Sequence, residues 1–249
     1  MDLGLRDRVY IVTGGTSGLG RAGAEALVTE GARVVVSSRD ETNVAETVGA
    51  LGGSERATGV VADNADPETA DRLVSAARTT WHRLDGALIS VGGPPPGNVM
   101  DITDDQWRAS FESVFLGAVR LARVVAAQLS DGGAIAFVLS TSVRSPIAGL
   151  AVSNGLRPGL AMVAKTLADE LGPRGIRVNG LLPGRVSTQR TLQLLPEEHV
   201  RRGVAETIPL RRFAEPEEFG RAAAFLLSPA ASFITGTMLP LDGGALRTF

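Results

Sequence analysis

The sequence predicts an α/β fold: a single doubly wound domain in which a seven-stranded, mainly parallel sheet carries helices on both faces. Short runs of apolar and β-branched residues, such as RVYIVTG at 8–14 and ARVVVSS at 32–38, alternate with helical patterns along the whole chain. Strands that are apolar on both faces are typical of a buried parallel sheet. A glycine-rich turn after the first run is the second indication, because doubly wound nucleotide-binding folds begin in this way.

The expected elements alternate along the chain. Strands are expected in the two runs above and in ATGVVAD, DGALISVGG, GAIAFVLST, IRVNGLLPG and GTMLPLDGG. The expected helices are 18–30, 41–51, 67–82, 104–130, 152–172 and about 215–227. No internal repeat, low-complexity segment or linker interrupts this order, so residues 1–249 are predicted to form one domain.

Composition excludes several classes of function. The chain has 249 residues and no cysteine, which excludes disulfides, thiolate catalysis and zinc–cysteine sites, and we predict no metal site. A net charge of −2 argues against a nucleic-acid partner. The N-terminal stretch MDLGLRDRVYIVTGG lacks the apolar core of a signal peptide, and no apolar run is long enough to span a bilayer. We therefore expect a cytoplasmic protein with no membrane partner.

The turn TGGTSGLG at 13–20 predicts a dinucleotide site in a Rossmann-type fold. The glycines at 14, 18 and 20 would let the backbone turn tightly and approach a pyrophosphate, which would sit at the positive N-terminus of the helix that follows. The spacing is Gly-x-x-x-Gly-x-Gly rather than Gly-x-Gly-x-x-Gly. The turn residues predicted to bind the cofactor are Gly14, Thr16, Ser17, Gly18, Leu19 and Gly20.

The end of the second strand favours NADP(H) over NAD(H). Ser38 stands where a carboxylate would hold the ribose of NAD, and Arg39 follows it. A planar guanidinium pairs well with the 2′-phosphate of NADP. At the end of the third strand, Asp63 and Asn64 could contact the adenine, or they could cap the helix that begins near Pro67.

With these motifs the whole chain resembles the short-chain dehydrogenase/reductase family, close to its β-ketoacyl carrier-protein reductase branch. TGGTSGLG matches the family's TG-x-x-x-G-x-G, GIRVNGLLPGRVST resembles its sixth strand and following loop, and ITGTMLPLDGG resembles its C-terminal strand. The resemblance implies an oxidoreductase that acts on a small-molecule carbonyl and carries a substrate lid at about 188–213. It also implies further cofactor positions, which are Val91, Gly92, Pro183, Gly184, Val186 and Thr188.

The lid sequence carries Arg190, Arg201, Arg202, Arg211 and Arg212, interleaved with Glu197, Glu198 and Glu206. A basic lid could attract a phosphopantetheine group or an acidic carrier protein. Because the charges alternate in sign, we interpret the segment as a mixed, solvated surface.

The family's catalytic positions are altered in this chain. Ser140 keeps the family's serine, thirteen positions before Ser153. Ser153 replaces the family's tyrosine, and Arg157 replaces its lysine. Because that lysine also contacts the cofactor, Arg157 is a predicted cofactor residue as well. Val114 stands where the family has an asparagine. Ser153 and Arg157 are four residues apart, so they share one helix face.

These replacements remove the usual proton donor. Tyr10 is the only tyrosine of the chain and lies in the first strand, where we expect it to face a helix layer. We predict that Ser140, helped by Ser142 or Ser153, orients a carbonyl, and that water or Arg157 stabilises the oxyanion. His199, in the lid, is a second candidate acid.

Two other functions remain open. The chain could be a catalytically inactive NADP(H)-binding sensor, or a structural subunit of a mixed oligomer. The resemblance implies a homotetramer, or a dimer, formed through helices 104–130 and 152–172. The substrate is not specified by the sequence.

Overall fold

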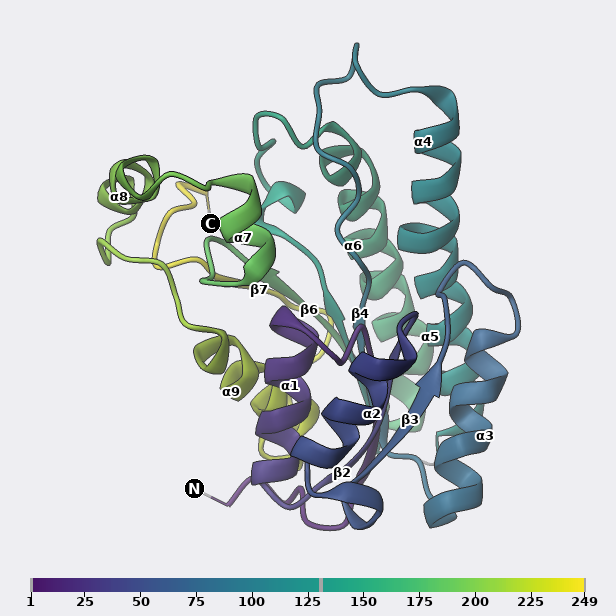
Figure 1. Cartoon of the computed structure of the whole chain (residues 1–249). Helices are drawn as coiled ribbons and strands as arrows, with labels where there is room; N and C mark the ends of the chain where they lie inside the picture. The colour runs from purple at the N-terminus through teal and green to yellow at the C-terminus, as the bar shows by residue number, and fades with distance from the viewer. Residues whose placement is uncertain (1, 130–131, 249) are drawn as a thin grey trace.

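The computed structural model describes residues 2–129 and 132–248, and its framework is one twisted seven-stranded sheet (Figure 1). The strand order is β3-β2-β1-β4-β5-β6-β7, and every pairing between neighbours is parallel. In chain order the strands are β1 Val9–Thr13, β2 Arg33–Ser38, β3 Ala57–Val61, β4 Gly86–Ser90, β5 Ala134–Val138, β6 Arg177–Pro183 and β7 Met238–Leu241. The doubly wound prediction is confirmed, and the sheet is wholly parallel over the described residues.

Helices cover both faces of the sheet. In chain order the helices are α1 Gly18–Thr29, α2 Glu41–Ala50, α3 Thr69–Trp81, α4 Asp104–Ser110, α5 Gly117–Gln128, α6 Ala151–Leu171, α7 Gln189–Leu194, α8 Glu198–Thr207 and α9 Pro216–Leu227. Figure 1 shows α1, α2 and α9 on one side of the sheet and α3, α5 and α6 on the other. Two apolar cores result, one on each face. Within the described residues, no helix is both long and apolar enough to cross a membrane.

The helix expected at 104–130 is not continuous. A π-helical segment, Phe111–Leu116, separates α4 from α5, and residue 130 lies outside the described residues. Val114, which the resemblance places at the family's asparagine position, belongs to this segment and is buried. π-Helical turns are frequent at functional sites. Their side-chain pattern differs little from that of an α-helix, so the sequence did not indicate this one.

The segment expected to form a lid contains two short helices. α7 and α8 project from the carboxyl end of β6, beyond the edge of the sheet (Figure 1). No residue of either helix is buried. The two helices therefore lie on the surface of the molecule.

Candidate active site

The candidate site lies where the crossover connections diverge on either side of β1, between the carboxyl ends of β1 and β4. In doubly wound folds, ligands bind at this switch point. Thr13 joins the two strand ends, because its Oγ1 donates to the Ser90 carbonyl at 2.9 Å and accepts from the Ser90 N–H at 3.0 Å. Two cavities open here, of about 500 and about 340 Å³, and both are lined by Gly93 and Pro94. They therefore form two neighbouring parts of one groove.

The glycine-rich turn has the shape of a phosphate cradle. Gly14 and Gly18 have φ values of +56° and +51°, in the left-handed region that favours glycine. A Cβ at Gly20 would overlap the carbonyl oxygen of Gly14, so the turn packs directly on the start of α1. The fold thus requires glycine at these three predicted positions.

The N-terminus of α1 is left free for an anion. Ser17 is the N-cap residue, but its side chain makes no capping hydrogen bond, and the first turn of α1 contains no acidic residue. The first backbone N–H groups of the helix therefore keep their positive potential. A Cβ at Gly18 would lie 3.6 Å from the Cγ2 of Thr188, which places the start of the lid against this turn.

The larger cavity collects the predicted residues of the nucleotide end. Those that line it are Gly14, Thr16, Ser17, Ser38, Arg39, Asp63, Asn64 and Gly92. Val91 is buried next to them in the chain but does not line the cavity.

The charged side chains at the position expected for the ribose are exposed to solvent. Arg39 is 81% exposed, and its Nη1 lies 3.9 Å from the Asp63 carboxylate. Asp40 does not line the cavity, because its carboxylate caps α2 by accepting from the Asn43 N–H at 2.8 Å. The α3 cap is Glu68, so Asp63 does not have the capping role that the sequence left open; it accepts from the Ala65 N–H instead.

The smaller cavity brings the three predicted catalytic residues together. Ser140, Ser153 and Arg157 all line it, as do the predicted cofactor residues Leu19, Pro183, Gly184, Val186 and Thr188. The Oγ atoms of Ser153 and Ser142 share a hydrogen bond of 3.2 Å, and Ser140 Oγ accepts from the Ser142 N–H at 3.1 Å. The three serines are thus linked at the carboxyl end of β5.

Arg157 is a buried cation whose partners are backbone carbonyls. Its Nη1 donates to the carbonyl oxygens of Val138 and Leu139, at 2.8 and 2.9 Å. Burial, with a smaller effect of the nearby Arg190 cation, lowers the pKa of Arg157 to about 10. Its Nε and Nη2 have no hydrogen-bond partner within the described residues and remain available to a ligand.

The other candidate acids lie elsewhere. The Tyr10 hydroxyl is buried and donates to the Leu227 carbonyl at 3.1 Å, on the α9 side of the sheet, and burial raises the pKa of Tyr10. His199 is 78% exposed on α8, 3.3 Å from Glu197, and does not line the cavity.

Arg190 corrects the interpretation of the lid as a purely solvated surface. Its guanidinium donates to the Gly93 and Pro94 carbonyls, at 3.3 and 2.7 Å, and it lines the smaller cavity. A Cβ at Gly93 would overlap this guanidinium, so a larger residue there would require the Arg190 side chain to move. Other lid arginines do face outward, and Arg202 pairs with Glu198 at 3.0 Å.

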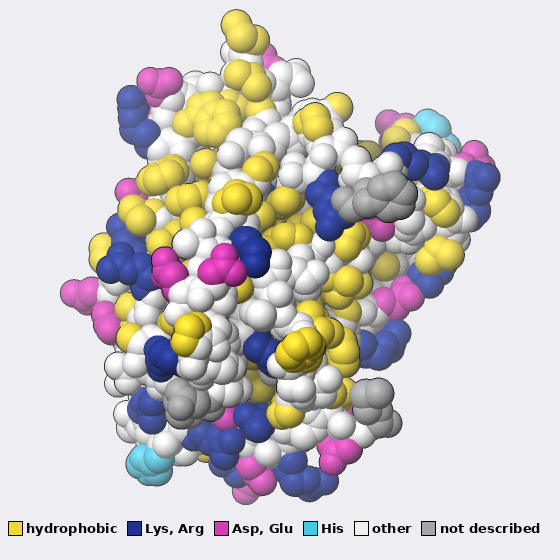
Figure 2. Space-filling model, turned by 180° about the vertical axis from the view of Figure 1, so that it is seen from behind, with side chains coloured by type: hydrophobic (Ala, Val, Ile, Leu, Met, Phe, Trp, Pro, Cys, Tyr) yellow, Lys and Arg dark blue, Asp and Glu magenta, His cyan; other side chains and the backbone are white. Residues whose placement is uncertain are grey.

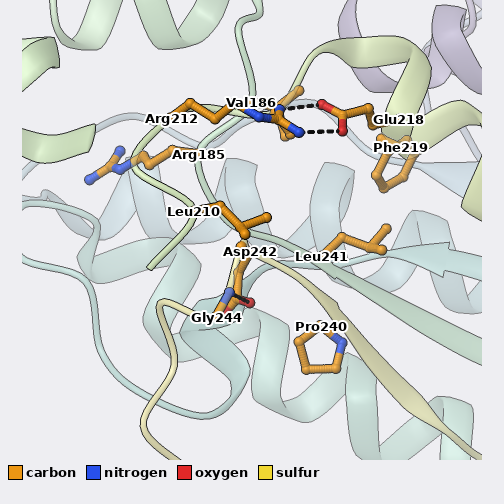
Figure 3. Close-up of a pocket in the computed structure, with 12 residues that line it drawn as sticks. Arg185, Val186, Leu210, Arg212, Glu218, Phe219, Pro240, Leu241, Asp242 and Gly244 are labelled. Carbon is orange, nitrogen blue, oxygen red and sulfur yellow. Dashed lines mark hydrogen bonds and ion pairs between the residues drawn. The ribbon is translucent and has the colours of Figure 1, made fainter. Parts of the chain in front are cut away.

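Arg185 is a site residue that sequence reasoning missed. It directly follows Pro183 and Gly184, and this adjacency was the available signal. It lines the smaller cavity and also a third one of about 430 Å³, shown in Figure 3, between the end of β7 and the start of α9. In that view Arg212 is paired with Glu218, through bonds of 2.6 and 2.8 Å, whereas Arg185 extends away from the pair.

Comparisons with known proteins agree with this arrangement. A family model described as Enoyl-(Acyl carrier protein) reductase matches residues 14–245. Human dehydrogenase/reductase SDR family member 4 is 34% identical over 245 residues, which cover 96% of this chain and 88% of that protein.

Two solved structures are also similar. The L-sorbose reductase of Gluconobacter frateurii, complexed with NADPH and L-sorbose, aligns with a TM-score of 0.93 and 32% identity over 100% of both chains. A short-chain oxidoreductase from Pseudomonas aeruginosa PAO1, solved in its apo form and containing an atypical catalytic center, aligns with a TM-score of 0.90 and 27% identity, covering 97% of this chain and 98% of that one.

Proposed function

Because the chain belongs to the short-chain dehydrogenase/reductase family of NAD(P)-dependent oxidoreductases, we propose that it uses NADP(H) to reduce a small-molecule carbonyl, of 3-oxoacyl or related ketone type. Ser153 and Arg157 take the places of the family's tyrosine and lysine. The observation that carries the proposal is that Ser140, Ser153 and Arg157 line a cavity that shares Gly93 and Pro94 with the cavity at the glycine turn.

The groove fits a dinucleotide along its length. The glycine turn and the free N-terminus of α1 suit the diphosphate. Ser38 and Arg39 line the ribose end without a carboxylate at the NAD position, which supports NADP(H), the cofactor present in the similar L-sorbose reductase structure. When bound, NADPH would supply the hydride for the carbonyl carbon.

The chain's own residues orient the carbonyl and stabilise negative charge on its oxygen. Ser140 Oγ accepts a backbone N–H, so its own proton is available to donate to a carbonyl oxygen. Arg157 adds a fixed positive charge and the N–H groups of two nitrogens, Nε and Nη2, that have no partner among the described residues. Water then supplies the proton that the family's tyrosine would have given. Positioning and charge stabilisation remain without that tyrosine, whereas loss of the acid costs about 10²–10⁴-fold in rate.

The alternative is an NADP(H)-binding protein without turnover. The observation that favours it is the lining of the smaller cavity, where the described ionisable side chains are Arg157, Arg185 and Arg190. None of these is a good proton donor near neutral pH. Such a chain would act as a redox sensor or as a structural subunit beside an active relative.

We also propose that the chain forms a homotetramer or dimer through α4, α5 and α6. Phe111 is 43% exposed and stacks on Phe115, and Met162 of α6 is 67% exposed. Figure 2, which views the molecule from behind, shows hydrophobic side chains spread over the upper part of that face. Exposed apolar surface of this kind is typical of protein interfaces.

The experiment is a fluorescence titration with NADPH, with NADH as competitor, followed by a screen for carbonyl-dependent NADPH oxidation. We expect micromolar binding of NADPH that NADH displaces poorly, and slow turnover of a ketone. Binding without any turnover would favour the sensor, co-purification with a tyrosine-containing relative would favour the structural subunit, and no binding would exclude both the enzyme and the sensor.

A further inference from the structure

We infer that the smaller cavity selects a carbonyl compound carrying an oxyanion group, a carboxylate or a phosphate, which Arg185 and Arg190 bind. This inference rests on the proposed function and names the substrate class of the same site.

The lining of the cavity is cationic. Arg157, Arg185 and Arg190 line it, and within the described part of the chain no aspartate or glutamate does. The other polar side chains that line it carry hydroxyl groups; they belong to Ser140, Thr141, Ser153, Thr188, Thr191 and Thr207. A cavity lined by guanidinium and hydroxyl donors, without a carboxylate, favours an anionic ligand.

Arg185 is without a side-chain partner among the described residues. Among residues 2–129 and 132–248, none forms a hydrogen bond or ion pair with its guanidinium, and partial burial lowers its pKa. Asp242 packs against Gly184, but its two carboxylate oxygens accept from the N–H groups of Gly244 and Leu246. Figure 3 shows Arg212 neutralised by Glu218 and Arg185 directed away from both. An uncompensated cation on a cavity wall is available for a ligand's charge.

Arg190 faces the same cavity from the lid. Its bonds to the Gly93 and Pro94 carbonyls hold α7 over the loop after β4 without neutralising its charge. Partial burial lowers its pKa, and its charge is felt by Arg157. An oxyanion bound between the lid and the β6 loop would relieve this repulsion among the cations.

The roles of the three arginines differ. Backbone carbonyl groups at the end of β5 hold Arg157 in place beside Ser140. We therefore assign Arg157 to the substrate's carbonyl group that is reduced. Arg185 and Arg190 come from the β6 loop and the lid, so we assign them to the ionic group at the other end of the substrate. A bidentate guanidinium contact with a carboxylate or phosphate is stronger than a neutral hydrogen bond.

The test is calorimetric titration of the NADP⁺-saturated full chain, in which no reduction can occur. The probes are acetoacetate against methyl acetoacetate, and dihydroxyacetone phosphate against dihydroxyacetone. We expect the charged member of at least one pair to bind about tenfold or more tightly, because hydrogen bonds to charged groups are strong. The two pairs distinguish a carboxylate site from a phosphate site.

Variants assign the effect to residues. Arg185→Gln and Arg190→Gln should each remove most of the preference, while Arg190→Lys should keep part of it. Arg201→Gln is the matched control, because Arg201 is a lid arginine that also donates to two carbonyls, those of Leu195 and Pro196, but does not line the cavity.

Equal or weaker binding of both charged probes would overturn the inference. So would a tenfold loss of NADP⁺ affinity in Arg185→Gln and Arg190→Gln, because these arginines would then serve the cofactor. A retained anion preference in a protein that never oxidises NADPH would contradict the reductase proposal and leave the inference standing.

Discussion

The Oγ atoms of Ser142 and Ser153 lie 3.2 Å apart, so Ser153, which we assign to the position of the family's tyrosine, is joined to the end of β5 by a serine–serine hydrogen bond. A serine hydroxyl has no acidity to offer near neutral pH, and its neighbour Arg157 holds its proton tightly. We therefore expect the site to orient a carbonyl, although none of the described side chains that line the smaller cavity is a good proton donor near neutral pH.

Restoring the acid should raise the rate. We predict that Ser153→Tyr with Arg157→Lys increases kcat for a ketone by about 10²–10⁴-fold, the usual effect of a positioned proton donor. The measurement is NADPH oxidation with the two purified proteins. Ser153→Phe with Arg157→Lys is the control for added bulk, and equal rates in the two double variants would show that protonation does not limit the reaction.

Removing the Ser140 hydroxyl should lower the rate. Ser140→Ala is expected to reduce kcat/KM by about 10²–10³-fold, as loss of an oxyanion donor does. NADPH affinity should change little, because Ser140 lines the smaller cavity and not the nucleotide end. Ser140 also caps the short turn at 141–143, so a thermal melt must accompany the kinetics. Unchanged turnover in the folded variant would exclude Ser140 from catalysis.

The rate should be independent of pH between about 6 and 9. Within the described residues, the ionisable side chains that line the smaller cavity are arginines. Burial lowers the pKa of Arg157 to about 10, so the group stays protonated below that pH and loses its charge as pH rises through it. We expect kcat/KM to be flat and then to fall above pH 9.

A rise in kcat/KM as the pH falls from 9 to 6 would contradict this and would make His199 the residue to test. His199→Asn distinguishes the two cases, because it should leave a flat profile flat and should remove such a rise.

Arg39 should determine the choice of cofactor. Arg39→Ala is predicted to weaken NADPH binding about tenfold or more and to leave NADH binding unchanged, since the guanidinium would contact only the 2′-phosphate. The exposed contact with Asp63 at 3.9 Å is too weak to prevent Arg39 from binding the 2′-phosphate. Arg33→Ala, at the start of the same strand, is the control. Equal loss of both nucleotides, or of neither, would contradict the NADP assignment.

The apolar face over α4, α5 and α6 should support the oligomer. A charge in place of exposed Met162 or Phe111 is expected to shift the mass measured by light scattering toward a smaller species. Val200→Glu, on the exposed lid helix α8, should not. If the unmodified chain is a monomer, the proposed oligomer is wrong.

Local chemistry explains why most of the fold was predictable. The expected helix 41–51 is observed as α2 at Glu41–Ala50, because Asp40 caps it with its own side chain. Strands with continuous apolar runs could only be central in a parallel sheet, and β1, β4, β5 and β6 are buried throughout. Ser153 and Arg157 share a face because their spacing is one helical turn.

The remainder depends on contacts that no local pattern reveals. Arg190 stands in a segment of alternating charge, which is typical of a solvated surface, yet the open space at Gly93 lets it turn into the cavity. The π-helical segment has the periodicity of a helix and was therefore expected as one. Which carbonyl oxygens Arg157 binds likewise depends on the packing of α6 against β5.

The most direct test of the central claim is transfer of deuterium from NADPH labelled with deuterium at the nicotinamide C4 to a ketone, followed by mass spectrometry of the product. The account predicts an alcohol with deuterium on the former carbonyl carbon, formed slowly by the unmodified chain and faster by Ser153→Tyr with Arg157→Lys. If NADPH binds with micromolar affinity and neither protein forms a labelled alcohol from any neutral or anionic ketone tested, the chain is not a reductase.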